Sequence, residues 1–166
     1  MKFFQRSALL AAALLAIAAS PAPTLPALPG GQAAPIAKPY DITADAKAQV
    51  DEAFAEARQT HKNVLLDFGG NWCTDCRMLA GTMALPPVQN WVGQNFVPVM
   101  IDIGPHMTRN LDIAARYGVK ITAVPSVLIV TPEGKLVNGN DVFGLADARH
   151  FSAQAMVNLL AKWQQG

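Results

Sequence analysis

The sequence has only two cysteines, Cys73 and Cys76, and three histidines in 166 residues. A structural zinc site takes four Cys or His ligands, and no second Cys pair or Cys/His pair is present to complete one. Covalent haem attachment requires a histidine directly after the second cysteine, where this chain has Arg77. A structural disulfide between residues three apart would close a very small loop and stabilise little. We therefore interpret the two cysteines as a chemically active pair.

Charge is also scarce, since charged residues make up 15% of the chain and neither sign dominates. Without Lys2 and Arg6, eleven basic residues stand against twelve acidic ones. The sequence has no stripe of basic residues interleaved with aromatic ones, which is the usual pattern of a nucleic-acid interface. We expect no nucleic-acid partner.

Long apolar runs are missing except at the N-terminus. Lys2 and Arg6 precede a run rich in alanine and leucine over residues 8–19, and residues 16–18 have the small-x-small pattern of a cleavage site. This pattern predicts that residues 1–20 are a signal peptide and that the protein is exported, to a bacterial periplasm. The alternative is an uncleaved anchor that tethers the protein to the inner membrane, although the run is short for a membrane span.

The chain after this run divides into two parts. Residues 21–42 contain six prolines, which predicts a disordered, extended linker. Residues 43–166 alternate between segments of helical and strand character and contain no internal repeat. They predict a single α/β domain with a central sheet.

The stretch around the cysteines carries the chemistry. The apolar segment 64–68 has the character of a buried strand, Gly69-Gly70 interrupts it, and good helix formers follow Cys76. At a helix N-terminus, unpaired N–H groups and the positive end of the helix dipole stabilise a Cys73 thiolate, and only the thiolate attacks a disulfide. Cys76, almost one helical turn later, is placed to resolve the mixed disulfide.

Two neighbours of the pair are candidates for supporting roles. Asp67 lies in the middle of the apolar strand, where a carboxylate is costly to bury without a function, and we expect it to transfer a proton to or from Cys76. Trp72 directly precedes Cys73 and offers an apolar surface to a substrate chain.

These motifs resemble the thioredoxin superfamily. The active-site segment of that family resembles Asp67-Phe68 followed by Trp72-Cys73-x-x-Cys76, its cis-proline loop resembles 123–126, and its glycine region resembles 142–144. The likeness extends from about residue 44 to the C-terminus and implies a thioredoxin fold, with a central mixed β-sheet flanked by helices. It also implies a substrate groove formed by Trp72, Val124, Pro125 and Gly144, with Val124 offering its backbone to the substrate.

Two departures from thioredoxin itself are informative. Pro86-Pro87 breaks the helix after the cysteines, which is more similar to the soluble domains of transmembrane disulfide reductases. Val97-Pro98 occupies the region where thioredoxin has a lysine near its buried aspartate.

Direction of electron flow depends on the residues between the cysteines. Thr74 and Asp75 stand there, without the histidine of strong oxidants, and we expect the charge of Asp75 to raise the pKa of Cys73, partly offset by Arg77. A less stable thiolate gives a more stable disulfide, which favours a reductase.

We therefore expect a monomeric protein-disulfide reductase without cofactor or metal, acting on protein or peptide disulfides. Family resemblance implies a membrane-bound disulfide reductase as its electron donor. Two alternatives stay open. One is a disulfide oxidase or isomerase. The other is a copper(I) chaperone that binds the metal through both thiols, with further candidate ligands in Met78, Met83, His106 and Met107.

Overall fold

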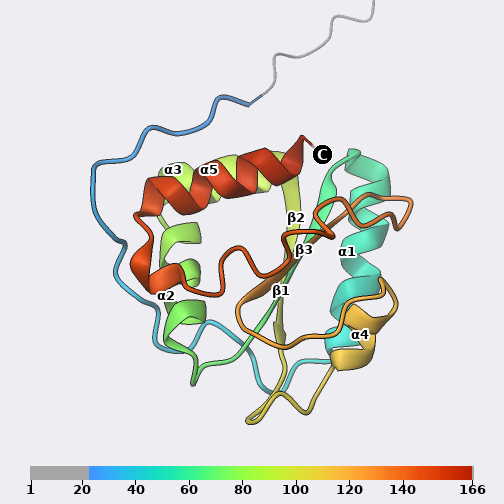
Figure 1. Cartoon of the computed structure of the whole chain (residues 1–166). Coiled ribbons are helices and arrows are strands. Elements are labelled where there is room, and N and C mark those ends of the chain that lie inside the picture. The colour runs from blue at the N-terminus through green and yellow to red at the C-terminus, as the bar shows by residue number, and fades with distance from the viewer. Residues whose placement is uncertain (1–22, 166) are drawn as a thin grey trace, which may run out of the picture.

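A computed structural model describes residues 23–165, and the expected signal peptide at 1–20 lies outside this part of the chain. Its centre is a sheet of three strands in the order β2-β1-β3. These are β1 (Asn63–Gly69), β2 (Phe96–Asp102) and β3 (Ser126–Val130). β1 pairs in parallel with β2 and antiparallel with β3. The predicted α/β fold with a central mixed sheet flanked by helices is confirmed (Figure 1).

Helices cover both faces of this sheet (Figure 1). On one face lie α1 (Ala46–Thr60) and the short α4 (Leu111–Ala115). On the other lie α2 (Thr74–Met83), α3 (Pro86–Asn95) and α5 (Ala153–Gln164), which is preceded by the 3-10 turn η1 (Ala148–His150). Within residues 23–165, no helix is both long enough and apolar enough to cross a membrane.

The alternation of side chains along β1 divides the core into two clusters. Leu66 and Phe68 point toward α1, whereas Leu65 points toward α2, α3 and α5. Successive side chains of a strand point to opposite faces, so Asp67 shares the face of Leu65 and lies on the side of α2. Because both faces are covered, residues 64–69 of the strand are apolar except at this one carboxylate.

Local sequence sets the helix boundaries on the α2 side. Cys73 is the N-cap of α2, and its sulfur accepts a hydrogen bond from the backbone N–H of Cys76 at 3.1 Å. α2 ends at Met83 and α3 begins at Pro86, which confirms the break expected at the two prolines. Proline is favoured in the first turn of a helix because the N–H it lacks would have no partner there.

The segment after β3 pairs with it through an isolated bridge and a side chain. Leu136 makes an isolated bridge with Val130. Beyond it, the side-chain amide of Asn138 takes the place of a backbone partner: it accepts a hydrogen bond from Ile129 N–H and donates one to the Val127 carbonyl. The free edge of β3 is therefore covered without a continuous strand.

Residues 23–42 are extended and held against the domain (Figure 1). Leu28 N–H donates to the side chain of Gln154 on α5, and Ile36 N–H donates to the Arg77 carbonyl on α2. Tyr40 is buried. This placement differs from the disordered linker that the proline content predicts. Proline lowers the entropy of an extended chain, and the apolar residues between the prolines contact the helices of the domain.

Candidate functional site

The two cysteines form a disulfide at the N-terminus of α2, with their Cα atoms 5.3 Å apart. Cys73 retains 6% of its surface, whereas Cys76 is fully buried. An incoming thiolate or disulfide can therefore reach Cys73 first. The N–H of Cys76 points at the Cys73 sulfur, where it would stabilise a thiolate after reduction.

Trp72 stands beside the disulfide with about half of its surface exposed (51%). Its indole N–H donates to the Gly104 carbonyl at 3.1 Å, in the loop after β2. Gly70 leaves room for this ring, because a Cβ there would overlap the indole. The tryptophan is thus held in place while offering an apolar face to solvent next to Cys73.

Val124 and Pro125 belong to a loop that approaches Cys73. Their peptide bond is cis, and the Val124 carbonyl oxygen is 3.7 Å from the Cys73 sulfur. Val124 is partly buried against the cluster that contains both cysteines. The structure therefore brings together Trp72, Cys73 and Val124, three of the residues expected to face a substrate.

Gly144 has different recorded neighbours. A Cβ on it would lie 2.6 Å from Asp141 Oδ1 and 3.0 Å from the ring of Trp163. Its segment runs beside β3, since Val127 N–H donates to the Val142 carbonyl. The contacts recorded in the described part of the chain do not connect Gly144 with the disulfide, and its place in the groove stays a prediction.

Asp67 is fully buried in β1. Its Oδ2 accepts a hydrogen bond from the hydroxyl of Tyr40 at 3.1 Å, and its Oδ1 has no hydrogen-bond partner among the described residues. Burial raises the pKa of Asp67 to about 7, and the hydrogen bond from Tyr40 acts in the opposite direction. A carboxyl group that titrates near neutral pH is suited to both accepting and releasing a proton.

Tyr40 is a residue that the sequence analysis missed, since it lies in the segment expected to be a linker. It packs with Cys73 and Cys76 in one buried cluster. Asn71 fixes its backbone through two hydrogen bonds of 2.9 Å, one to the N–H and one to the carbonyl of Tyr40. Nothing in the local pattern around Tyr40 indicates this contact, because its partners are about 30 residues away.

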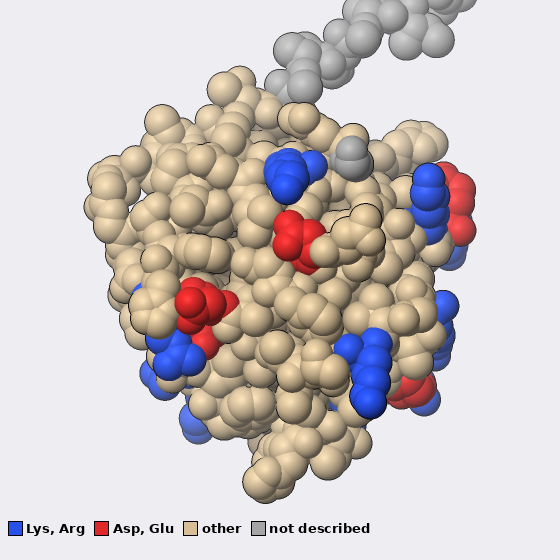
Figure 2. All heavy atoms as spheres, viewed as in Figure 1, with Lys and Arg blue, Asp and Glu red and all other residues tan. Residues whose placement is uncertain are grey.

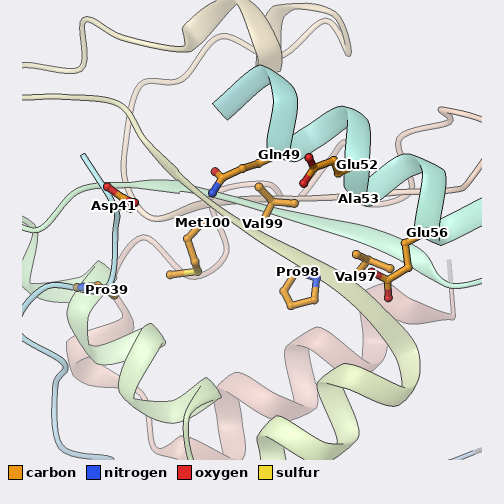
Figure 3. A pocket seen from close by; sticks show the side chains of 10 residues that line it. All are labelled: Pro39, Asp41, Gln49, Glu52, Ala53, Glu56, Val97, Pro98, Val99 and Met100. Atoms are coloured by element: carbon orange, nitrogen blue, oxygen red, sulfur yellow. The ribbon is translucent and has the colours of Figure 1, made fainter. Parts of the chain in front are cut away.

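A cleft of about 450 Å³ lies behind this cluster, between α1 and the outer strand β2 (Figure 3). Pro39 and Asp41, the two neighbours of Tyr40, line it together with Met100. Met100 is paired with Asp67 across the sheet and also packs against the cysteine cluster. Strand β2 thus stands between this cleft and Asp67 on β1.

Asp75, between the cysteines, is paired with Arg149. The guanidinium Nε is 3.0 Å from Asp75 Oδ1, and the backbone N–H of Arg149 donates to the same oxygen at 2.8 Å. Burial acts to raise the pKa of Asp75, but the hydrogen bonds from Arg149 outweigh it and the pKa is lowered. From the sequence, Arg77 is the residue expected to offset this charge. Arg77 instead donates to the Ile36 carbonyl.

Replacing Arg149 with methionine tests this pairing. The variant leaves the Asp75 carboxylate with less positive charge nearby, which makes a Cys73 thiolate less stable. We expect a more negative reduction potential, by on the order of 10–30 mV, measured by equilibration with thiol buffers. Arg77→Met is the matched comparison and should shift the potential less. A larger shift in Arg77→Met than in Arg149→Met would contradict the assignment.

The additional ligands considered for copper are dispersed. Met78 and Met83 belong to the hydrophobic cluster between α2, α3 and α5, and Met107 packs against the opposite cluster. His106 is exposed in the loop after β2. These residues have structural surroundings of their own and do not gather at the two cysteines.

The surface gives no sign of a charged interface on the face in view. Lysine, arginine, aspartate and glutamate side chains stand there in small, separated groups surrounded by uncharged surface (Figure 2).

Comparison with known proteins gives a consistent result. Residues 45–132 match the family model described as thioredoxin-like. The chain is 27% identical over 123 residues to the thiol:disulfide interchange protein DsbD 2 of Pseudomonas aeruginosa, and 30% identical over 101 residues to DsbD 1 of the same organism. These alignments cover 74% and 61% of this chain but only 19% and 17% of the relatives, so the chain spans less than a fifth of their length.

A solved structure is similar over nearly its whole length. The disulphide isomerase of Xylella fastidiosa Temecula1 is 39% identical with a TM-score of 0.70, and the match covers 75% of this chain and 95% of that one. The family model spans more than half of the present chain, including both cysteines. The chain therefore belongs to the thioredoxin-like family, among the thiol–disulfide oxidoreductases that carry a Cys-x-x-Cys disulfide.

Proposed function

We propose that this protein is an exported protein-disulfide reductase. The observation that carries the direction is the charge between the cysteines: Asp75 is held as a carboxylate, paired with Arg149 from outside the Cys-x-x-Cys segment, and neither intervening residue is cationic. An anion at this point disfavours the Cys73 thiolate and therefore favours the disulfide form of the protein. A dithiol with a stable disulfide form transfers its electrons readily to other disulfides.

The reaction proceeds in two exchanges. The Cys73 thiolate attacks one sulfur of a substrate disulfide, forms a mixed disulfide, and releases the first substrate thiolate. Cys76 loses its proton and attacks Cys73, which releases the second substrate thiolate and restores the Cys73–Cys76 disulfide. Two electrons pass from the protein dithiol to the substrate. Asp67 accepts the proton of Cys76 in this scheme.

Substrate binding relies on the residues around Cys73. An extended peptide would lie across Trp72 and the backbone of Val124, with its disulfide at the 6% exposed Cys73. Peptides that bind along a backbone in this way are recognised by main-chain hydrogen bonds, which accept many sequences. Protein and peptide disulfides are the substrate class that fits this arrangement.

Location and electron supply follow from the function proposed. The N-terminal pattern at 1–20 is that of a signal peptide, and we assign the protein to the periplasm, tethered to the inner membrane if the signal is retained. A reductase there must itself be reduced after each turnover. A membrane-bound disulfide reductase is the partner that we propose, and the DsbD relatives are thiol:disulfide interchange proteins.

The reduction potential of the cysteine pair tests the direction. A value near that of thioredoxin, about −270 mV, is expected for a reductase. The measurement is equilibration of the full chain with defined ratios of reduced and oxidised dithiothreitol or glutathione, followed by trapping of free thiols. A value near −180 mV would indicate an isomerase, the activity named for the Xylella structure, and one near −120 mV would indicate an oxidase.

A further inference from the structure

Asp67 is expected to take the proton of Cys76, but its hydrogen bond within the described residues comes from another side chain. The hydrogen bond recorded for the Asp67 carboxyl group is the one from Tyr40. Tyr40 in turn packs with Cys73 and Cys76 in one buried cluster. Tyr40 is 3% exposed, so its phenol donates to Asp67 from inside the buried cluster that also contains Cys76.

Gly69 shows how closely these groups meet. A Cβ added to Gly69 would overlap the Tyr40 hydroxyl and lie 2.7 Å from the Cys76 sulfur. The hydroxyl and the sulfur thus approach the same point above the Gly69 backbone. The lack of a side chain at Gly69 leaves the space that the Tyr40 hydroxyl and the Cys76 sulfur both approach.

We propose that Tyr40 is a proton-relay residue between Cys76 and Asp67. This inference rests on the dithiol function proposed above. In the mixed disulfide, the Cys76 S–H gives its proton to the Tyr40 oxygen while the Tyr40 O–H gives its proton to the Asp67 carboxylate. One S–H bond and one O–H bond break, two O–H bonds form, and the hydroxyl is regenerated. The negative charge moves from Asp67 to the Cys76 sulfur, which then attacks Cys73.

Besides Asp67, one charged residue of the neighbouring strands acts on Tyr40. The strand partners of Asp67 are Met100 and Val127, both uncharged. Asp102, at the end of β2, acts on Tyr40 through its charge and is paired with Arg109. Burial and the nearby Asp67 charge hold the pKa of Tyr40 well above its usual value, so its hydroxyl keeps a proton to donate.

Placement of Tyr40 depends on one polar side chain. The Asn71 side chain accepts a hydrogen bond from the Tyr40 N–H and donates one to the Tyr40 carbonyl, each at 2.9 Å. Asn71 directly precedes Trp72 and Cys73. The N-terminal segment is thereby fastened to the turn that carries the cysteines. Asn71 is a positioning residue in this arrangement, and its loss should weaken the relay without removing the hydroxyl.

The test separates the two exchanges. The reduced full chain is mixed with dithiobis(nitrobenzoate) in a stopped-flow instrument, where attack by Cys73 releases one coloured thiolate and attack by Cys76 releases the second. Tyr40→Phe keeps the ring and removes only the hydroxyl. We expect its second phase to slow by about tenfold or more at pH 7, with the first phase changed less than about twofold. Tyr117→Phe, the other tyrosine, is the matched control and should change neither phase.

The pH profile distinguishes a relay from simple packing. Without the hydroxyl, the Asp67 carboxylate loses a hydrogen-bond donor, its pKa rises further, and the second phase should need a higher pH. The double variant Tyr40→Phe/Asp67→Asn should be no slower than Asp67→Asn alone, because both act on one transfer. A second phase in Tyr40→Phe with the wild-type rate and pH profile would overturn the proposal, as would additive slowing in the double variant.

If Tyr40→Phe does not give the wild-type circular dichroism spectrum, Asn71→Ala takes its place, and an unchanged second phase there overturns the relay. Failure of the proposed function is seen separately, as a wild-type protein that releases no second thiolate. A wild-type protein with two phases and a Tyr40→Phe variant identical to it would reject the relay alone.

Discussion

Replacing Cys73 with serine is expected to abolish disulfide reduction, with a loss of rate on the order of 10³-fold or more. A serine hydroxyl is not ionised at neutral pH and does not attack a disulfide. Cys73 is the cysteine that retains exposed surface, beside Trp72 and Val124. The measurement is the reduction of a protein disulfide, such as that of insulin, with dithiothreitol as the source of electrons.

Cys76→Ser is the matched variant and should behave differently. It keeps the attacking thiol but lacks the resolving one, so we expect a stable mixed disulfide between Cys73 and the substrate, visible by mass spectrometry. Cys73→Ser should form no such adduct, because Cys76 is fully buried. Adducts in Cys73→Ser but not in Cys76→Ser would reverse the two roles.

Replacing Asp67 with asparagine is expected to stabilise the oxidised protein at pH 8, by up to about 4 kcal/mol. The pKa of Asp67 is raised from 3.8 to about 7 in the folded state, mainly by burial. Asparagine has nearly the same shape, can still accept a hydrogen bond from Tyr40, and cannot ionise. The expected gain comes from removing the need to bury a carboxylate.

The sign of the pH dependence follows from the raised pKa. Between about pH 4 and pH 7 the folded protein keeps a proton on Asp67 that the unfolded chain has lost. The free energy of unfolding therefore falls as the pH rises through this window, and the stabilising contribution is fully present only below about pH 4. Asp67→Asn should remove this slope, so the two proteins should have similar stability at pH 4 and differ most at pH 8.

Urea unfolding of the oxidised proteins at pH 4, 6 and 8 measures this difference. Asp112→Asn is the control, since Asp112 is exposed and paired with Lys47 at the surface. Its pKa is lowered, mainly by the hydrogen bond from Lys47, so any small effect should have the opposite direction with pH. Equal slopes in wild type and Asp67→Asn between pH 4 and pH 8 would show that Asp67 is ionised in the folded protein throughout.

Asp67→Asn and Tyr40→Phe concern the same buried carboxyl group. A buried carboxyl group with a pKa near neutrality costs stability at the pH where the protein works. The same group provides an acceptor for the proton of Cys76. Asp67→Asn should therefore be more stable than the wild type but slower in the second exchange. Such a trade-off between stability and activity is expected when a residue is retained for the reaction and not for the fold.

The sequence by itself determined the local features of this protein. The apolar run before the cysteines, the glycine pair and the helix formers after them place Cys73 at the start of α2, because each depends only on neighbouring residues. The continuous apolar run over residues 64–68, typical of a strand buried on both faces, likewise predicts that Asp67 is buried. The break at Pro86 follows from the backbone geometry of proline.

Only the tertiary structure decided which distant side chains complete the site. Tyr40 reaches Asp67 from 27 residues away, and Arg149 reaches Asp75 from 74 residues away. Neither contact leaves a periodic signal, since each depends on how a whole segment packs on the domain. The proline content around Tyr40 predicted a disordered linker. A proline-rich chain is equally compatible with an extended segment bound to a surface, and composition does not distinguish the two. The polar partner of Asp67 therefore came from the N-terminal segment, once Gly69 left space for it.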